Sequence, residues 1–236
     1  VYMGSESQLS LLFPRTSQKR DATTNMKALQ ELKDYLADAT LPKKSQVDAL
    51  AHFLYLYHSK LHYDNTPRVR ANSLECCHQA ILNLPKAFAT LTSQQPEILG
   101  MILCSRADPA ADTRKAAQQA TQALEAMDSE SLDFSIQALV TQGMWDYLQR
   151  ILSYGKPLAM HQDLFQKKSQ PQDAKLSEKH EEELDERFVR IVGTALGGLQ
   201  IHILQQYDES LPNAENVKYM WRTLSSPKAA LRRKTY

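Results

Sequence analysis

Two histidines are the residues of this sequence whose spacing comes nearest to a chemical site. His58 and His62 stand four residues apart in a segment with helical apolar spacing, so both would face the same side of a helix, as paired metal ligands do. No third ligand stands nearby in the sequence, and Tyr63-Asp64 fits a solvated helix end equally well. A helical enzyme that uses His58, His62 and a carboxylate stays open as a function class, but we expect no metal site.

The cysteines, carboxylates and glycines lack the neighbours that chemistry would need. Cys76, Cys77 and Cys104 are an odd number without C-x-x-C spacing, which favours buried thiols in a reducing, intracellular setting. The acidic run at 181–186 fits the positive start of a helix, and Gly197-Gly198 lies inside a helical pattern rather than in a phosphate-binding loop. We therefore expect no catalytic residue, no metal and no cofactor in this chain.

The composition is that of a soluble, helical protein. Of the 236 residues 42% are hydrophobic and 23% are charged, only seven are glycine, and no β-branched alternating run occurs. The net charge of +1 means that a nucleic-acid partner would have to be met by a local patch. No apolar run approaches the ~18 residues of a membrane span, and no signal peptide is visible, so we expect neither a membrane partner nor a targeting segment.

A pattern that begins with aspartate recurs three times. Asp21, Asp64 and Asp108 are separated by 43 and 44 residues, and each is followed six residues later by a cation, namely Lys27, Arg70 and Arg114. A near-constant period of about 40–47 residues is typical of HEAT and armadillo repeats. The alternative is that Asp, Pro and Arg are common at helix starts and match here by chance.

The stacking of helix pairs gives a physical reason for such a repeated pattern. A pair of helices buries too little apolar surface to fold alone, so neighbouring pairs must cover each other. We predict an all-α fold, a HEAT/ARM-like α-solenoid of stacked antiparallel helix pairs. The aspartates and cations would hydrogen-bond between adjacent units as a structural ladder made of Asp21, Lys27, Asp64, Arg70, Asp108 and Arg114.

The apolar spacing predicts a single module over residues 9–236, with the repeats clearest in 9–125. Helices are expected from Asp21 to about Leu36, from Val47 to near Tyr63 and from Pro67, where Thr66 can cap, to about Leu82. Further ones should start at Pro85, Pro96 and Asp108. Residues 1–8 are expected to be disordered or a cloning remnant.

The second half is predicted to be helical without the period. Gly143 is a possible break in a helical stretch that ends near Leu152, and 166–177 reads as a flexible loop. The longest helix should run through Leu184–Ile203, with its glycines serving close packing rather than a kink. A last pair would carry the apolar stripe Val217, Met220, Trp221 and Leu224 and then 227–236, and an array that stops there reads as part of a longer solenoid.

Cations near helix ends are the candidate binding residues. They could follow a phosphate backbone along one edge of the solenoid, with an affinity that falls as salt rises. The alternative is that they only keep the protein in solution. The candidate contacts are Arg15, Lys19, Arg20, Lys43 and Lys44.

Three segments resemble the N-terminal part of listerin, the RING-type E3 ubiquitin ligase family of ribosome-associated quality control. Lys19–Leu32 is similar to the opening motif of the family, two basic residues, Asp, Thr and then Lys-Ala-Leu-x-Glu-Leu, and Asn65–Ala71 is similar to its Arg-Val-Arg segment. Ile98–Pro109 matches a stretch in which Trp and Phe usually stand at Ile102 and Ala107, so this chain diverges there. The resemblance covers about residues 9–125.

The resemblance implies a HEAT module that docks a long ligase on the 60S ribosomal subunit left by a stalled ribosome. The partner there would be the quality-control factor that recognises peptidyl-tRNA. A distant zinc-binding RING, absent from this chain, would bind an E2 and ubiquitinate the nascent chain, so the full-length protein would be the enzyme. We expect a monomer in the cytosol.

A different HEAT scaffold is the alternative reading. A transport receptor or a tubulin-binding array would use the same inter-helix turns to hold a protein or a peptide.

Overall fold

The helices of this chain begin where prolines and small polar residues interrupt the apolar spacing. The computed structural model describes residues 22–127, 135–154, 156–165 and 178–205. Pro67 and Pro85 occupy the first turns of their helices, where the missing N–H costs nothing. The α-helices are α2 (Ala22–Ala37), α3 (Lys43–Ser59), α4 (Pro67–Asn83), α5 (Pro85–Ser93), α6 (Glu97–Cys104), α7 (Ala111–Glu125), α8 (Ile136–Ser153), α9 (Pro157–Phe165) and α10 (Glu178–Gln205).

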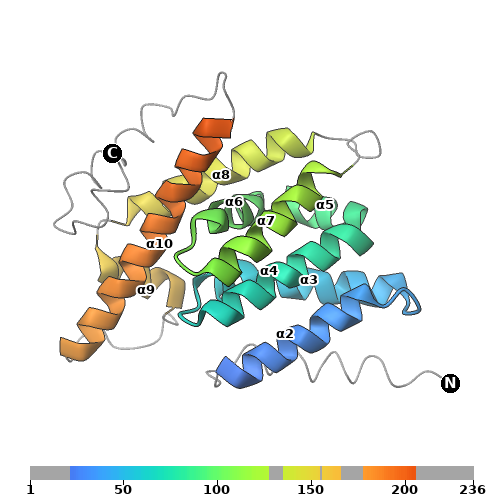
Figure 1. The fold of residues 1–236 in the computed structure, drawn as a ribbon, viewed down its shortest axis with the longest axis horizontal. Helices are drawn as coiled ribbons and strands as arrows, with labels where there is room; N and C mark the ends of the chain where they lie inside the picture. The colour runs from blue at the N-terminus through green and yellow to red at the C-terminus, as the bar shows by residue number, and fades with distance from the viewer. Residues whose placement is uncertain (1–21, 128–134, 155, 166–177, 206–236) are drawn as a thin grey trace.

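The described helices pack in two layers, which confirms the predicted all-α solenoid. Figure 1 shows α2, α4 and α7 side by side in one layer, with α4 in contact with both neighbours. The other layer contains α3, α6 and α8, with α6 between its two neighbours. One apolar core runs between the layers, and no strand occurs in the described ranges. Its largest fully buried side chains include Tyr57, Tyr63, Tyr147, Phe53, Phe88 and Leu74.

Two glycines let α6 and α8 cross in close contact. A Cβ atom at Gly143 would lie 1.8 Å from the carbonyl oxygen of Pro96, and one at Gly100 would lie 2.2 Å from the carbonyl oxygen of Gly143. No side chain fits there, so Gly143 is required for packing. The possible break at this residue does not occur, because α8 continues through it as a regular helix.

Two further local predictions differ from the structure. The helix expected to reach Tyr63 ends at Ser59, and a 3₁₀ turn, η1 (Leu61–Tyr63), follows it. A second 3₁₀ turn, η2 (Ser105–Ala107), follows α6 in the same way. Thr66 occupies the N-cap position of α4, but its side chain makes no capping hydrogen bond.

The longest described helix, α10, crosses the stack obliquely and contacts η2, α8, α6 and α9 (Figure 1). Its spacing was predicted from the sequence, including a role for glycine in close packing. A Cβ atom at Gly198 would lie 2.4 Å from Cα of Cys104, whereas one at Gly193 would meet nothing within 4 Å. The predicted opening helix near Leu9, the 166–177 loop and the last pair beyond Val217 lie outside the described residues.

Candidate functional site

The repeated aspartate organises the turn that precedes a helix of the first layer. Asp64 Oδ1 accepts a hydrogen bond from the backbone N–H of Thr66 at 2.8 Å, and Asp108 Oδ1 accepts one from that of Ala110 at 2.8 Å. Asp64 follows η1 and leads into α4, and Asp108 follows η2 and leads into α7. We call this side of the stack, from which α4 and α7 both start, the turn edge.

The arginine six residues after each aspartate clamps the same turn. Arg70 Nη1 donates to the carbonyl oxygens of Asp64 and Asn65 at 2.8 and 3.0 Å. Arg114 Nη1 donates to those of Asp108 and Pro109 at 2.9 and 2.8 Å. The two units therefore share one turn geometry, and the spacing of six positions the guanidinium over its own turn.

Between units, the structure brings together Arg70 and Asp108. Nε and Nη2 of Arg70 donate to the two carboxylate oxygens of Asp108, both at 2.9 Å, and each side chain is only 3% exposed. Such a planar two-bond pair fixes geometry better than a single contact does. It holds the turn before α4 against the turn before α7.

The rest of the predicted ladder is arranged differently. Asp21 lies outside the described residues, and Lys27 is exposed and has no ion-pair partner among the described side chains. Lys33 and Glu75, whose charged atoms lie 2.8 Å apart, link α2 to α4 instead. Arg114 has no aspartate one period further on, because Leu152 stands there.

Two arginines of α10 cover the turn edge. Arg190 Nη2 donates to the carbonyl oxygen of Tyr63, and Arg187 Nε donates to Oδ1 of Asn65, both at 2.8 Å. Burial and the neighbouring charge of Arg70 lower the pKa of Arg190 to about 10. Sequence reasoning missed both residues, although a cation beside the apolar stripe of α10 was a visible signal.

The two histidines at metal-ligand spacing, His58 and His62, contact different groups of residues. His62 is buried, with Nε2 at 2.8 Å from the hydroxyl of Tyr147 and Nδ1 at 3.5 Å from that of Tyr57. Burial, with the charges of Arg190 and Arg70, holds the pKa of His62 well below its ordinary value. This polar group joins α3 and η1 to α8.

His58 belongs to a separate ionic cluster between α3, α6 and α8. Glu97 Oε2 lies 2.6 Å from His58 Nε2 and 3.0 Å from Arg150 Nη1. Although burial opposes its charge, these two partners hold the pKa of Glu97 below its ordinary value. No group of three metal-ligating side chains occurs in the described ranges.

Cys76, Cys77 and Cys104 are all free and fully buried. Burial raises the pKa of each thiol, that of Cys104 to about 12. A thiol in that state is a poor nucleophile, so these three residues fill the core.

The candidate binding cations lie at different places. Arg15, Lys19 and Arg20 are outside the described residues, but they precede α2, which starts on the same side of the stack as α4 and α7. Lys43 and Lys44 are exposed in the first turn of α3, at the opposite edge. There Lys43 Nζ lies 3.5 Å from the carbonyl oxygen of Asn83, at the negative end of α4.

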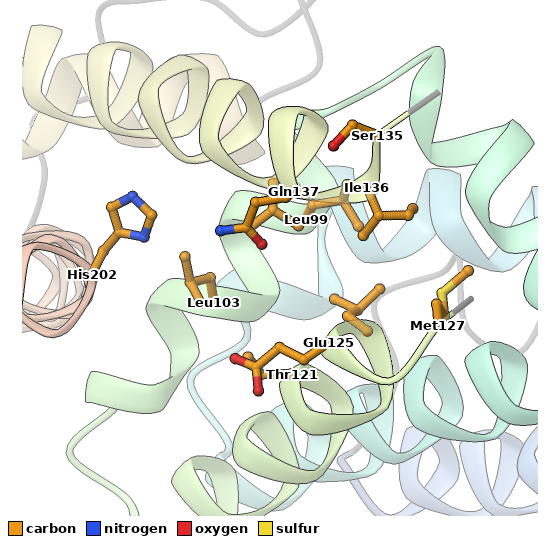
Figure 2. Close-up of a pocket in the computed structure, with 11 residues that line it drawn as sticks. Leu99, Leu103, Thr121, Glu125, Met127, Ser135, Ile136, Gln137 and His202 are labelled. Carbon is orange, nitrogen blue, oxygen red and sulfur yellow. The ribbon is translucent and has the colours of Figure 1, made fainter. Parts of the chain in front are cut away.

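A pocket of about 610 Å³ opens between α6, α7, α8 and α10 (Figure 2). Its lining is mixed. The apolar part comes from Leu99, Leu103, Leu124, Met127, Ile136 and Val140, and the polar part from Thr121, Glu125, Ser135, Gln137 and His202. In Figure 2, His202 of α10 lies across the space from Leu103. No prediction from the sequence pointed to this pocket, because its walls come from four separate helices.

Comparison with protein families decides the identity. The family model for the E3 ubiquitin-protein ligase listerin, N-terminal domain, matches residues 5–236. The chain belongs to the listerin family. None of the curated proteins matches the chain. The crystal structure of an engineered protein is similar over 96% of this chain and 95% of that chain, with 12% sequence identity and a TM-score of 0.47.

The match to the listerin domain extends beyond residues 9–125, on which the resemblance was based. Two of the listerin-like segments form the turn edge, since one contains Arg70 and the other contains Asp108. At the divergent position Ile102 the side chain is fully buried in α6. Within the described helices of this listerin domain, none is long and apolar enough to cross a membrane.

Proposed function

We propose that this listerin domain is a non-catalytic module that docks its ligase on the 60S subunit of a stalled ribosome, so that a distant RING can ubiquitinate the nascent chain. Membership of the listerin family is the observation that carries this proposal. In support, the polar clusters of the described residues bind one another and hold helices together. The zinc would be held by the RING, the E2 would bind there, and the domain would act as a monomer in the cytosol.

The turn edge is the surface that we assign to docking. It presents the starts of α4 and α7, whose backbone N–H groups favour negative charge, beside the exposed cations Arg68 and Lys115. The described helix α2 also starts on this side of the stack (Figure 1), and Arg15, Lys19 and Arg20 precede it in the sequence. Phosphates of ribosomal RNA fit such a surface, and so do acidic side chains of a ribosomal protein.

Charge reversal on the two edges tests this assignment. The doubly substituted chains Lys19→Glu/Arg20→Glu and Arg68→Glu/Lys115→Glu are sedimented with purified 60S subunits over a range of salt concentrations. Because each pair removes two cations that face phosphate, each should weaken binding and reduce the slope of log affinity against log salt by about two.

Lys43→Glu/Lys44→Glu supplies a matched control at the opposite edge, with the same change in charge. If that pair reduces the affinity as much as the others do, both edges contact the ribosome. Binding that is unaffected by salt and by all three double substitutions contradicts docking through cations. Binding to tubulin or to a transport-signal peptide, with none to 60S subunits, would instead favour a different HEAT scaffold.

A further inference from the structure

Arg190 of α10 is a half-buried cation that lacks a counter-charge within the described part of the chain. Its Nη2 donates to the carbonyl oxygen of Tyr63 at 2.8 Å, but none of the ion pairs between described side chains includes it. The buried carboxylate of Asp108 does not pair with it, because both oxygens of that carboxylate bind Arg70. The other N–H groups of Arg190 are unpaired but not buried, so they face solvent.

The surroundings of Arg190 oppose its charge. Burial and the positive charges of Arg70 and Arg187 lower its pKa to about 10, although the charge of Asp108 acts in the opposite direction. In native proteins a cation that is partly removed from water is normally paired. The described residues supply no such partner, so the arrangement calls for an anion from another molecule.

The acidic start of α10 limits which kind of anion fits beside Arg190. Glu186 stands one helical turn before Arg190, but it is exposed and forms no ion pair with it. Three further exposed glutamates precede it at 181–183. An RNA strand would bring a row of phosphates against these negative charges, whereas a protein can present a single carboxylate. One acidic side chain therefore fits this place better than a nucleic acid does.

We propose that Arg190 binds one acidic side chain of a protein on the 60S subunit. The proposal rests on the docking function and names the partner group for the part of the turn edge that α10 covers. Arg187, whose Nε donates to Oδ1 of Asn65 at 2.8 Å, is a second cation beside this contact. A guanidinium offers parallel N–H groups that match the two oxygens of a carboxylate, so the contact would fix orientation as well as affinity.

Neutralising Arg190 separates a binding role from a structural one. Arg190→Gln keeps a donor for the carbonyl oxygen of Tyr63 but removes the charge. We expect its affinity for purified 60S subunits to fall at least about tenfold, because loss of one partner from a charged contact at an interface is costly. Its thermal unfolding midpoint should equal or exceed that of the unsubstituted chain, because the charge that is removed has no counter-charge in the free protein.

Lys86→Gln is the matched control, since Lys86 is an exposed cation in the first turn of α5, at the opposite edge. It should leave the affinity unchanged, and an equal loss in both variants overturns the proposal. Unchanged affinity in Arg190→Gln also overturns it, and so does a lower unfolding midpoint, which would show that Arg190 is structural. Absence of 60S binding by the unsubstituted chain refutes the docking function itself, so the two failures are distinguishable.

Carbodiimide cross-linking identifies the partner group. Arg190→Lys keeps the charge and places a primary amine at position 190, which a carbodiimide joins to a carboxylate without a spacer. With saturating 60S subunits, mass spectrometry should find position 190 linked to an aspartate or glutamate of a ribosomal protein. No link, or a link to an acid of the chain itself, overturns the proposal. So does an affinity loss in Arg190→Gln that lowers the slope of log affinity against log salt by about one, which indicates an RNA phosphate.

Discussion

Arg70 and Arg114 occupy the same position in one sequence motif, but they differ in burial. They therefore contribute differently to stability. Both guanidinium groups hold the carbonyl oxygens five and six residues before them. Arg70 is 3% exposed and also pairs with the equally buried Asp108, whereas Arg114 is exposed. The motif was visible in the sequence, but the difference in burial was not, because it depends on α10 lying over the first turn.

Removal of Arg70 should therefore cost far more than removal of Arg114. Arg70→Ala leaves the carboxylate of Asp108 buried without its counter-charge, a loss of about 3–5 kcal/mol in the free energy of unfolding. Arg114→Ala removes bonds from an exposed side chain and should cost about 1 kcal/mol or less. Chemical denaturation of both variants measures the difference, and equal losses would contradict the inter-unit lock.

His62 should make the domain sensitive to mild acid. Its pKa is well below the ordinary value in the folded state, while the unfolded chain titrates near ~6.5. As the pH falls through that value the unfolded state takes up a proton that the folded state does not, so stability is lost by up to about 1.4 kcal/mol per pH unit. Stability from this residue is complete above the unfolded pKa.

The free energy of unfolding, measured from pH 7.5 to pH 5 in urea, checks this prediction. His62→Gln removes the titration and should flatten the pH dependence, even if the variant is less stable at every pH. An unchanged slope would show that other groups, such as His78 and His202, control the acid response.

At the scale of the helices, the glycines differ in whether close packing requires them. Gly143→Ala should cost about 1–3 kcal/mol or more, because the added methyl would overlap the carbonyl oxygen of Pro96 and push α6 from α8. Gly193→Ala meets nothing and should stabilise α10 by about 0.5–1 kcal/mol. Thermal unfolding compares the two, and a stabilising Gly143→Ala would show that α6 and α8 do not cross this closely.

The sequence predicted most of the helices, because prolines and helical apolar spacing are local signals. It did not predict α9 or η1, where short segments take their conformation from the helices around them. Gly143 was misread for a related reason. A glycine in a helical pattern can mark a break or a close approach, and only the position of Pro96 on another helix distinguishes the two.

At the scale of the whole molecule, the period of 43 and 44 residues predicted the stack and its turn edge. It could not predict the oblique path of α10, the pocket beside His202 or the positions of Arg187 and Arg190, since each depends on contacts between residues far apart in the sequence. The binding cations remain a prediction. Lys43 and Lys44 stand at the opposite edge from the start of α2, so one contact surface cannot be read from charge alone.

One measurement tests most directly whether this domain supplies recruitment rather than chemistry. The full-length ligase, with and without residues 5–236, is given purified 60S subunits that carry peptidyl-tRNA, the peptidyl-tRNA-recognising factor, E1, E2 and ubiquitin. We predict that the deletion abolishes ubiquitination of the nascent chain while E2-dependent autoubiquitination continues at its former rate. Nascent-chain ubiquitination that is unchanged by the deletion would contradict the docking role.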